Sequence, residues 1–255
     1  PTARRLAATL LVLLVGLAGC GPDAPAPSPE DPLALELKGI ALLERYDEND
    51  QLRAVETLRR VVELQPAWRE ARVNYALALA TTHRAENLPL ALAEYDKVLA
   101  EDPWNPYALF QSALVLRFQG RTDAAIVPLE RLALVDPDDP GVHYWLGTLS
   151  TERADERDDL AEAHLRRAVE LAPNDPSSIY GLYSVLARAG KGETAEARSL
   201  IERFQGFEEA AKFGSPALVK HLKRGNAEYG EAGRYALAIR DLARPTGAVF
   251  SDASA

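Results

Sequence analysis

The chain has few residues suited to metal, redox or disulfide chemistry. Cys20 is its one cysteine, which excludes an intramolecular disulfide and a thiolate metal cluster. Its four histidines form no HExxH motif, and no glycine-rich phosphate loop or G-x-S-x-G motif occurs. We therefore expect no cofactor, no metal and no catalytic residues, and a protein that is not an enzyme.

Aromatic residues are scarce, and long alternating runs of β-branched residues are missing, which favours an all-α fold over a sheet. Acidic residues outnumber basic ones by 38 to 29. Without Arg4 and Arg5, which belong to an expected signal peptide, the net charge falls from −9 to 27 − 38 = −11. A chain this acidic lacks the clustered cations that neutralise phosphates, so we expect no nucleic-acid partner.

The N-terminus has the pattern of an export signal. Two arginines precede an apolar run, Leu6–Ala18, which is shorter than the roughly 20 residues of a membrane-spanning helix. The run ends in Leu17-Ala18-Gly19-Cys20, which resembles the lipobox of bacterial lipoproteins. The resemblance implies a signal peptide at 1–19, cleavage before Cys20, and lipidation of that cysteine. The alternatives are an ordinary cleaved signal or a buried core cysteine.

A Pro-rich linker follows at 20–33, where GPDAPAPSPEDP carries prolines and acidic residues without large apolar side chains. This composition predicts an extended tether between the lipid and the folded part. In lipoprotein sorting, Gly21 instead of Asp after the cysteine favours the outer membrane. We therefore expect an envelope protein that is lipid-anchored and faces the periplasm.

Four segments share one spacing of apolar residues and proline. Ala125, Leu129, Leu132 and Pro137 follow one another at intervals of four, three and five, and the pattern recurs at Ala54–Pro66, Ala91–Pro103 and Ala161–Pro173. Each pattern follows a helix-like segment with a small residue, at Gly39, Ala76, Ala113 or Gly147. This layout resembles the tetratricopeptide repeat (TPR), in which two helices approach closely at small residues. The resemblance implies an all-α, right-handed superhelix of antiparallel hairpins over 34–206.

The third hairpin is the clearest. Pro106 begins its first helix, Gly120 ends it, Asp123 is a candidate cap for the second helix, and Asp136-Pro137 closes it. In the other clear hairpins, extra residues fall in the internal turns, around Tyr46–Asp50, His83–Leu88 and Glu152–Asp159. A fifth hairpin from Pro176 to Gly206 is degenerate, because Tyr183 stands where a small residue is expected.

Beyond the repeats we expect capping helices over 207–244 and a tail at 245–255. The tail ends in TGAVFSDASA, and methionine is absent from the sequence. This junction resembles lipoproteins in which TPR repeats precede an FG-GAP type β-propeller. The alternative function is therefore the targeting or interaction module of a larger protein with a missing downstream domain.

In TPR proteins the first helices line a concave face that binds peptides. The resemblance places these residues on that face: Tyr107, Phe110, Leu114, Arg117, Tyr144, Thr148, Tyr180, Ser184 and Arg188. Phe110, Tyr144 and Tyr180 occupy equivalent positions and form either an aromatic ladder for a peptide or packing between hairpins. The Lys and Asn positions of the family's carboxylate clamp are mostly apolar, aromatic or hydroxyl residues here, so that variant is not expected.

His143 and His164 belong to the two helices of one hairpin. They could approach each other, and in the favoured interpretation each is a partly exposed helical side chain. The predicted function is thus binding: a membrane-anchored scaffold or adaptor for a protein or peptide partner.

Overall fold

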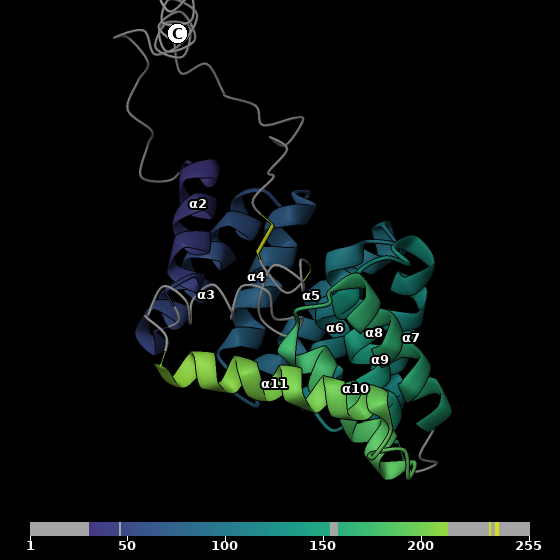
Figure 1. Ribbon diagram of the computed structural model, residues 1–255. Coiled ribbons are helices and arrows are strands. Elements are labelled where there is room, and N and C mark those ends of the chain that lie inside the picture. Colours follow the sequence, from purple (N-terminus) through teal and green to yellow (C-terminus); the bar gives the residue numbers. More distant parts are fainter. Residues whose placement is uncertain (1–30, 46, 154–157, 214–234, 236–237, 240–255) are drawn as a thin grey trace, which may run out of the picture.

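In the computed structural model, the described residues are 31–45, 47–153, 158–213, 235 and 238–239. They form ten α-helices and no strand (Figure 1). In chain order the helices are α2 (Pro32–Leu43), α3 (Glu48–Leu64), α4 (Arg69–Thr81), α5 (Asn87–Glu101), α6 (Pro106–Phe118), α7 (Thr122–Val135), α8 (Pro140–Glu152), α9 (Asp158–Leu171), α10 (Pro176–Arg188) and α11 (Ala195–Phe213). The expected signal peptide, Cys20, the linker up to residue 30 and the tail at 245–255 lie outside the described residues.

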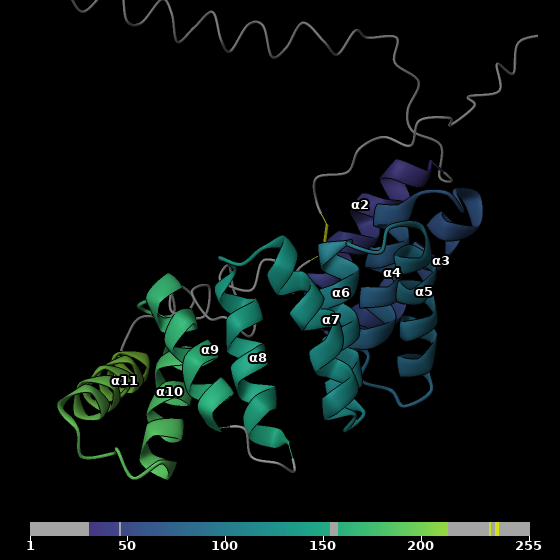
Figure 2. The ribbon, with the colours of Figure 1, turned by 90° about the vertical axis from the view of Figure 1, so that its right-hand side faces the viewer.

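The helices pair into five hairpins, and each hairpin packs against the next (Figure 2). The all-α solenoid expected from the repeats is confirmed, and the helices end near the predicted turns. None of the described helices combines the length and the apolar character that crossing a membrane requires.

Four of the five first helices begin with an Asp or Asn cap followed directly by proline. The cap side chain accepts a hydrogen bond from a first-turn N–H at 2.8–3.1 Å, and proline takes the first position, where no N–H is needed. The pairs are Asp31-Pro32, Asn105-Pro106, Asp139-Pro140 and Asp175-Pro176. These caps fix where each first helix begins.

The second helices bury the residues whose spacing the sequence repeats. All of the following are at most 1% exposed: Ala54, Leu58, Val61, Ala91, Tyr95, Val98, Ala125, Leu129, Leu132, Ala161, Leu165 and Ala168. Burying one Leu side chain contributes roughly 1.5–3 kcal/mol, so this stripe is a main source of stability.

The small residues of the first helices lie where the paired helices approach closely. A Cβ added at Gly147 would lie 2.5 Å from Leu165 Cγ, and one at Gly39 would lie 2.4 Å from Leu58 Cγ. Both distances are shorter than van der Waals contact, so these positions need glycine for packing.

Two local expectations need correction. Asp123 does not cap α7, because Arg121 holds the cap position and Asp123 lies inside the first turn. The second helix of the fifth hairpin, α11, continues past Gly206 to Phe213, into the region assigned to capping helices. Gly206 lies inside this helix and does not interrupt it.

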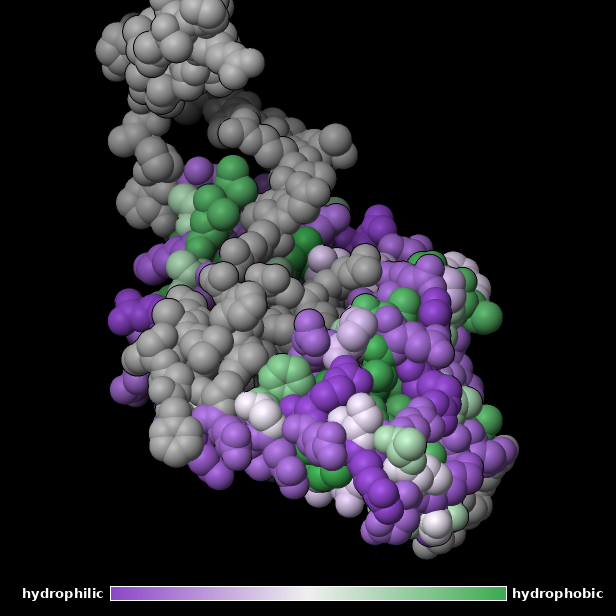
Figure 3. Space-filling model, in the orientation of Figure 1, coloured by the Kyte–Doolittle hydropathy of each residue, from purple (hydrophilic) through white to green (hydrophobic). Residues whose placement is uncertain are grey.

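Figure 3 shows hydrophobic side chains gathered on α2, at the upper left of the view. Leu37 of this helix is 53% exposed, while Ile40 and Leu43 are buried against the neighbouring helices. The described surface elsewhere in this view is mostly polar, with smaller hydrophobic areas between the polar side chains.

Candidate peptide-binding face

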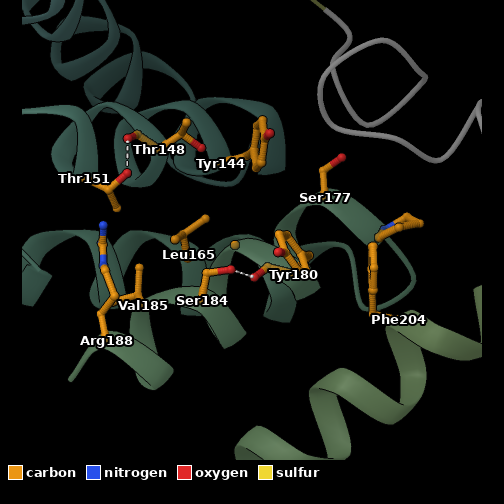
Figure 4. Close-up of a pocket in the computed structure, with 12 residues that line it drawn as sticks. Tyr144, Thr148, Thr151, Leu165, Ser177, Tyr180, Ser184, Val185, Arg188 and Phe204 are labelled. Atoms are coloured by element: carbon orange, nitrogen blue, oxygen red, sulfur yellow. Dashed lines mark hydrogen bonds between the residues drawn. The ribbon is translucent and has the colours of Figure 1, made fainter. Parts of the chain in front are cut away.

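A pocket of about 490 Å³ lies between α8 and α10, with Phe204 of α11 at one end (Figure 4). It gathers five of the nine residues expected on the concave face: Tyr144, Thr148, Tyr180, Ser184 and Arg188. We call this set, with Phe204 and Leu165, the α8–α10 pocket. The repeat register therefore places residues from successive first helices around one cavity.

Aromatic rings provide the apolar part of this pocket. Tyr180 is 49% exposed, and its ring centroid lies 4.7 Å from that of Phe204. Tyr144 is half-buried, with its ring 5.0 Å from that of Trp145. Tyr180 thus presents an accessible ring surface, whereas Tyr144 both packs within the core and borders the cavity.

The polar groups of the pocket are mostly engaged within their own helices. The Ser184 hydroxyl donates to the Tyr180 carbonyl at 2.8 Å, and Thr151 donates to the Thr148 carbonyl at 2.7 Å. Arg188 donates to Asp158 at 2.6 Å, with 47% of its side chain exposed. The hydroxyl oxygens can therefore accept from a ligand, and the guanidinium retains donors for it.

The other four predicted residues lie on α6, and the structure does not bring them into the α8–α10 pocket. Phe110 is completely buried, which is the core-packing alternative and not an exposed rung of a ladder. Tyr107 and Leu114 are half-buried against the same core cluster. Arg117 bonds Glu152 at 2.7 Å and stacks 4.8 Å above the Trp145 ring, so it links two hairpins.

A residue from much later in the chain covers Phe110. The Tyr235 ring lies 6.2 Å from Phe110 and meets Tyr107 edge-on at 5.2 Å. Its hydroxyl donates to the Asp136 carboxylate at 2.7 Å. Residues 235 and 238–239 thus lie against the first helices of the middle hairpins, the face on which a peptide was expected (Figure 1).

Two side-chain amides bond the backbone of these residues. Asn74 accepts from the Ile239 N–H at 2.8 Å and donates to the Ile239 carbonyl at 3.0 Å. Gln111 donates to the Tyr235 carbonyl at 2.6 Å. Neither amide was predicted as a functional residue, although each stands two residues before the small residue of its helix, Ala76 or Ala113. Their equivalent positions in two successive repeats were the feature of the sequence from which a shared role could have been predicted.

Behind Asn74 lies a buried carboxyl group. Glu36 of α2 is fully buried, and its Oε1 accepts from Asn74 Nδ2 at 2.7 Å. Burial raises the pKa of Glu36 to about 7, opposed by the Asn74 hydrogen bond and reinforced by the charge of Glu70. Asn74 is therefore buried between the Glu36 carboxyl group and the backbone of Ile239.

His143 and His164 approach each other, and both are partly exposed helical side chains. His143 Nδ1 and His164 Nδ1 lie 3.1 Å apart, and His143 Nε2 is 2.8 Å from the Pro137 carbonyl. Burial and the neighbouring ring lower the pKa of His164. In the described part of the chain, no group of three or more His, Cys, Asp or Glu could hold a metal ion. The pair is therefore a contact between α8 and α9.

Comparison with known families and structures supports the repeat assignment. Residues 82–147 match the family model described as tetratricopeptide repeat. Comparison with curated protein sequences gives no significant match.

Three similar solved structures illustrate the likeness. MamA from Desulfovibrio magneticus RS-1 is 19% identical, with 74% of this chain and 99% of that chain covered and a TM-score of 0.58. PilF of Pseudomonas aeruginosa is 23% identical, with 80% and 86% covered and a TM-score of 0.59. MamA of MSR-1 is 20% identical, with 68% and 97% covered and a TM-score of 0.53. At these identities the likeness concerns the fold, which is an all-α solenoid of tetratricopeptide-type hairpins.

Proposed function

We propose that this protein is a scaffold that binds a segment of a protein partner on its concave face, with the α8–α10 pocket as the anchoring site. The observation that carries the proposal is the accessible Tyr180 ring at a cavity of about 490 Å³. Tyr and Arg are enriched among the residues that dominate protein interfaces, and the pocket contains both, as Tyr180 and Arg188.

The pocket chemistry favours an apolar side chain flanked by a polar or acidic group. Tyr180 and Phe204 supply stacked ring surface, and Arg188 stands at the other end beside Thr151 (Figure 4). Arg188 already pairs with Asp158, so an acidic ligand group would compete for it or share it. A peptide carboxylate at that end would gain a charge-assisted hydrogen bond.

The second part of the proposal concerns where in the cell the protein is located. The Leu17-Ala18-Gly19-Cys20 sequence supports lipidation at Cys20, which would hold the scaffold at the outer membrane facing the periplasm. Anchoring raises the effective concentration of partners at the membrane, so a modest affinity of the pocket suffices. Mass spectrometry of the mature N-terminus tests this: a diacylated, N-acylated Cys20 supports it, and an unmodified residue there contradicts it.

The decisive experiment for binding is photo-crosslinking in native membranes with the reactive group at Tyr180. The matched control carries it at Leu134 of α7, which is 77% exposed and outside the pocket. One dominant adduct at Tyr180, absent at Leu134 and lost on Arg188→Ala, is expected. Equal adducts at both positions, or none at Tyr180, would refute the pocket as the binding site.

A further inference from the structure

The backbone of one segment of the chain is held by amides at equivalent positions of successive repeats. Asn74 and Gln111 are 111 − 74 = 37 residues apart, one repeat, and face the same side of the solenoid. Asn74 bonds both the N–H and the carbonyl of Ile239, and Gln111 bonds the carbonyl of Tyr235. Because these bonds involve only main-chain groups, they do not depend on the side chains of the segment.

The side chains of the segment also pack into the core of the solenoid. Tyr235 and Ile239 are each 7% exposed, and they pack in two different core clusters. Tyr235 lies with Phe110 and Trp145, whereas Ile239 lies with Val73 and Val115. The pattern is an aromatic hydroxyl followed, four positions later, by a branched aliphatic side chain.

We infer that this stretch of the concave face, formed by α4 and α6, is a second peptide-binding subsite. Its occupant in the structure is the chain's own stretch that carries Tyr235 and Ile239, of which residues 235, 238 and 239 are described. The inference rests on the proposed function: the partner engages this subsite with a segment of the same Tyr-x-x-x-Ile chemistry and displaces the cis segment. The two subsites use different hydrogen-bonding side chains, because the α8–α10 pocket contains neither Asn74 nor Gln111.

The nature of the contacts explains why the segment can be exchanged. Its main-chain bonds are made to side-chain amides, and its Tyr235 hydroxyl bonds the Asp136 carboxylate, which ends α7. Another peptide forms the same hydrogen bonds, and water molecules form some of them while neither peptide occupies the face. Successive hairpins of the described solenoid also contact each other directly, and these contacts do not involve the segment. The tether gives the cis segment a high effective concentration, so a free peptide competes poorly until that segment is weakened.

The test uses the full chain and a fluorescein-labelled peptide with the sequence of residues 233–241, GRYALAIRD. Anisotropy titrations compare the native sequence with the Tyr235→Ala/Ile239→Ala variant, in which the cis segment loses both anchors. We expect the variant to bind the peptide at least tenfold more tightly. Adding Asn74→Ala to the variant should abolish the gain, as should replacing the peptide's Tyr and Ile by Ala. Adding Leu134→Ala, at an exposed position outside both subsites, should leave it unchanged.

Equal affinity of the native chain and the variant would overturn the inference, as would a gain that survives Asn74→Ala. If the variant fails to fold, a photo-reactive residue at 235 decides. Its intramolecular crosslink to α6 should fall when excess peptide is added, and a crosslink that resists saturating peptide identifies the segment as permanent core. Because the peptide is synthetic, these outcomes do not depend on finding a natural partner at Tyr180. Failure here and failure of the proposed function are thus separate results.

Discussion

Glu36 is the side chain that we expect to reduce stability as the pH rises. It is fully buried, its Oε1 bonds Asn74, and its Oε2 has no hydrogen-bond partner among the described residues. Burial raises its pKa from 4.5 to about 7. Because the folded state binds this proton more tightly than the unfolded state, the stability from neutral Glu36 is complete below pH 4.5 and is lost as the pH rises through 7.

The magnitude follows from the shift. Each pKa unit corresponds to about 1.4 kcal/mol, so a rise from 4.5 to about 7 corresponds to roughly 3 kcal/mol. Glu36→Gln removes the titration and keeps the oxygen that accepts from Asn74. In urea unfolding, we expect the free energy of unfolding of the variant, relative to the native chain, to be roughly 2–3 kcal/mol higher at pH 8.5 than at pH 5.

The comparison between the two pH values isolates this group. The Gln amide would meet no acceptor at the Oε2 position, and that cost of roughly 1–3 kcal/mol is the same at both pH values. Glu70→Gln is the matched control, because Glu70 raises the pKa of Glu36 less than burial does. Parallel pH dependence in the native chain and Glu36→Gln would show that Glu36 ionises normally, and the reasoning from burial would fail.

Three further predictions concern the hairpins. In thermal unfolding, Gly147→Ala should lower the free energy of unfolding by about 1–3 kcal/mol, because the added Cβ would lie 2.5 Å from Leu165 Cγ. Gly206→Ala, where the added Cβ meets no atom within 4 Å, should raise it by about 0.5–1 kcal/mol in the same measurement. Tyr95→Phe should raise the free energy of urea unfolding by about 1 kcal/mol, because the buried hydroxyl has no partner in the described residues; a loss would reveal an unseen partner. The pKa of His164 is lowered chiefly by burial, so the free energy of unfolding should fall as the pH drops below 6.5 and this side chain becomes protonated. His164→Asn should make the free energy of unfolding depend less on pH in this range, and an unchanged pH dependence would contradict the prediction.

The hairpins could be predicted because their signals are local and repeated. Ala125, Leu129 and Leu132 fall on one helical face, and a stacked repeat buries that face in every unit, so the same spacing recurs. The Pro106 start was equally readable, because a cap and a proline act within one turn. Asp123 was misassigned because Asp is favoured both as a cap and within the first turn, and only the backbone distinguishes the two.

The concave face was harder to predict because its environment depends on distant residues. Phe110 looks exposed when the hairpin is considered alone, yet it lies beneath Tyr235, which is 235 − 110 = 125 positions later. Asn74 and Gln111 look like solvent-facing polar residues for the same reason, and both are buried. The proximity of Tyr144, Thr148, Tyr180, Ser184 and Arg188 could be read from the repeat register, because these residues lie on two neighbouring first helices.

The two parts of the concave face would select a partner by different means. Asn74 and Gln111 bond main-chain groups, so they add affinity for many sequences and little discrimination among them. Discrimination must come from side-chain sites, at Tyr235 and Ile239 in the cis segment and at Tyr180 in the pocket. A partner that fills both parts must also expel the tethered segment, which penalises peptides that match only the backbone bonds. Tyr180→Ala should therefore change which partners are captured, whereas Asn74→Ala should weaken all partners that use this subsite by a similar factor.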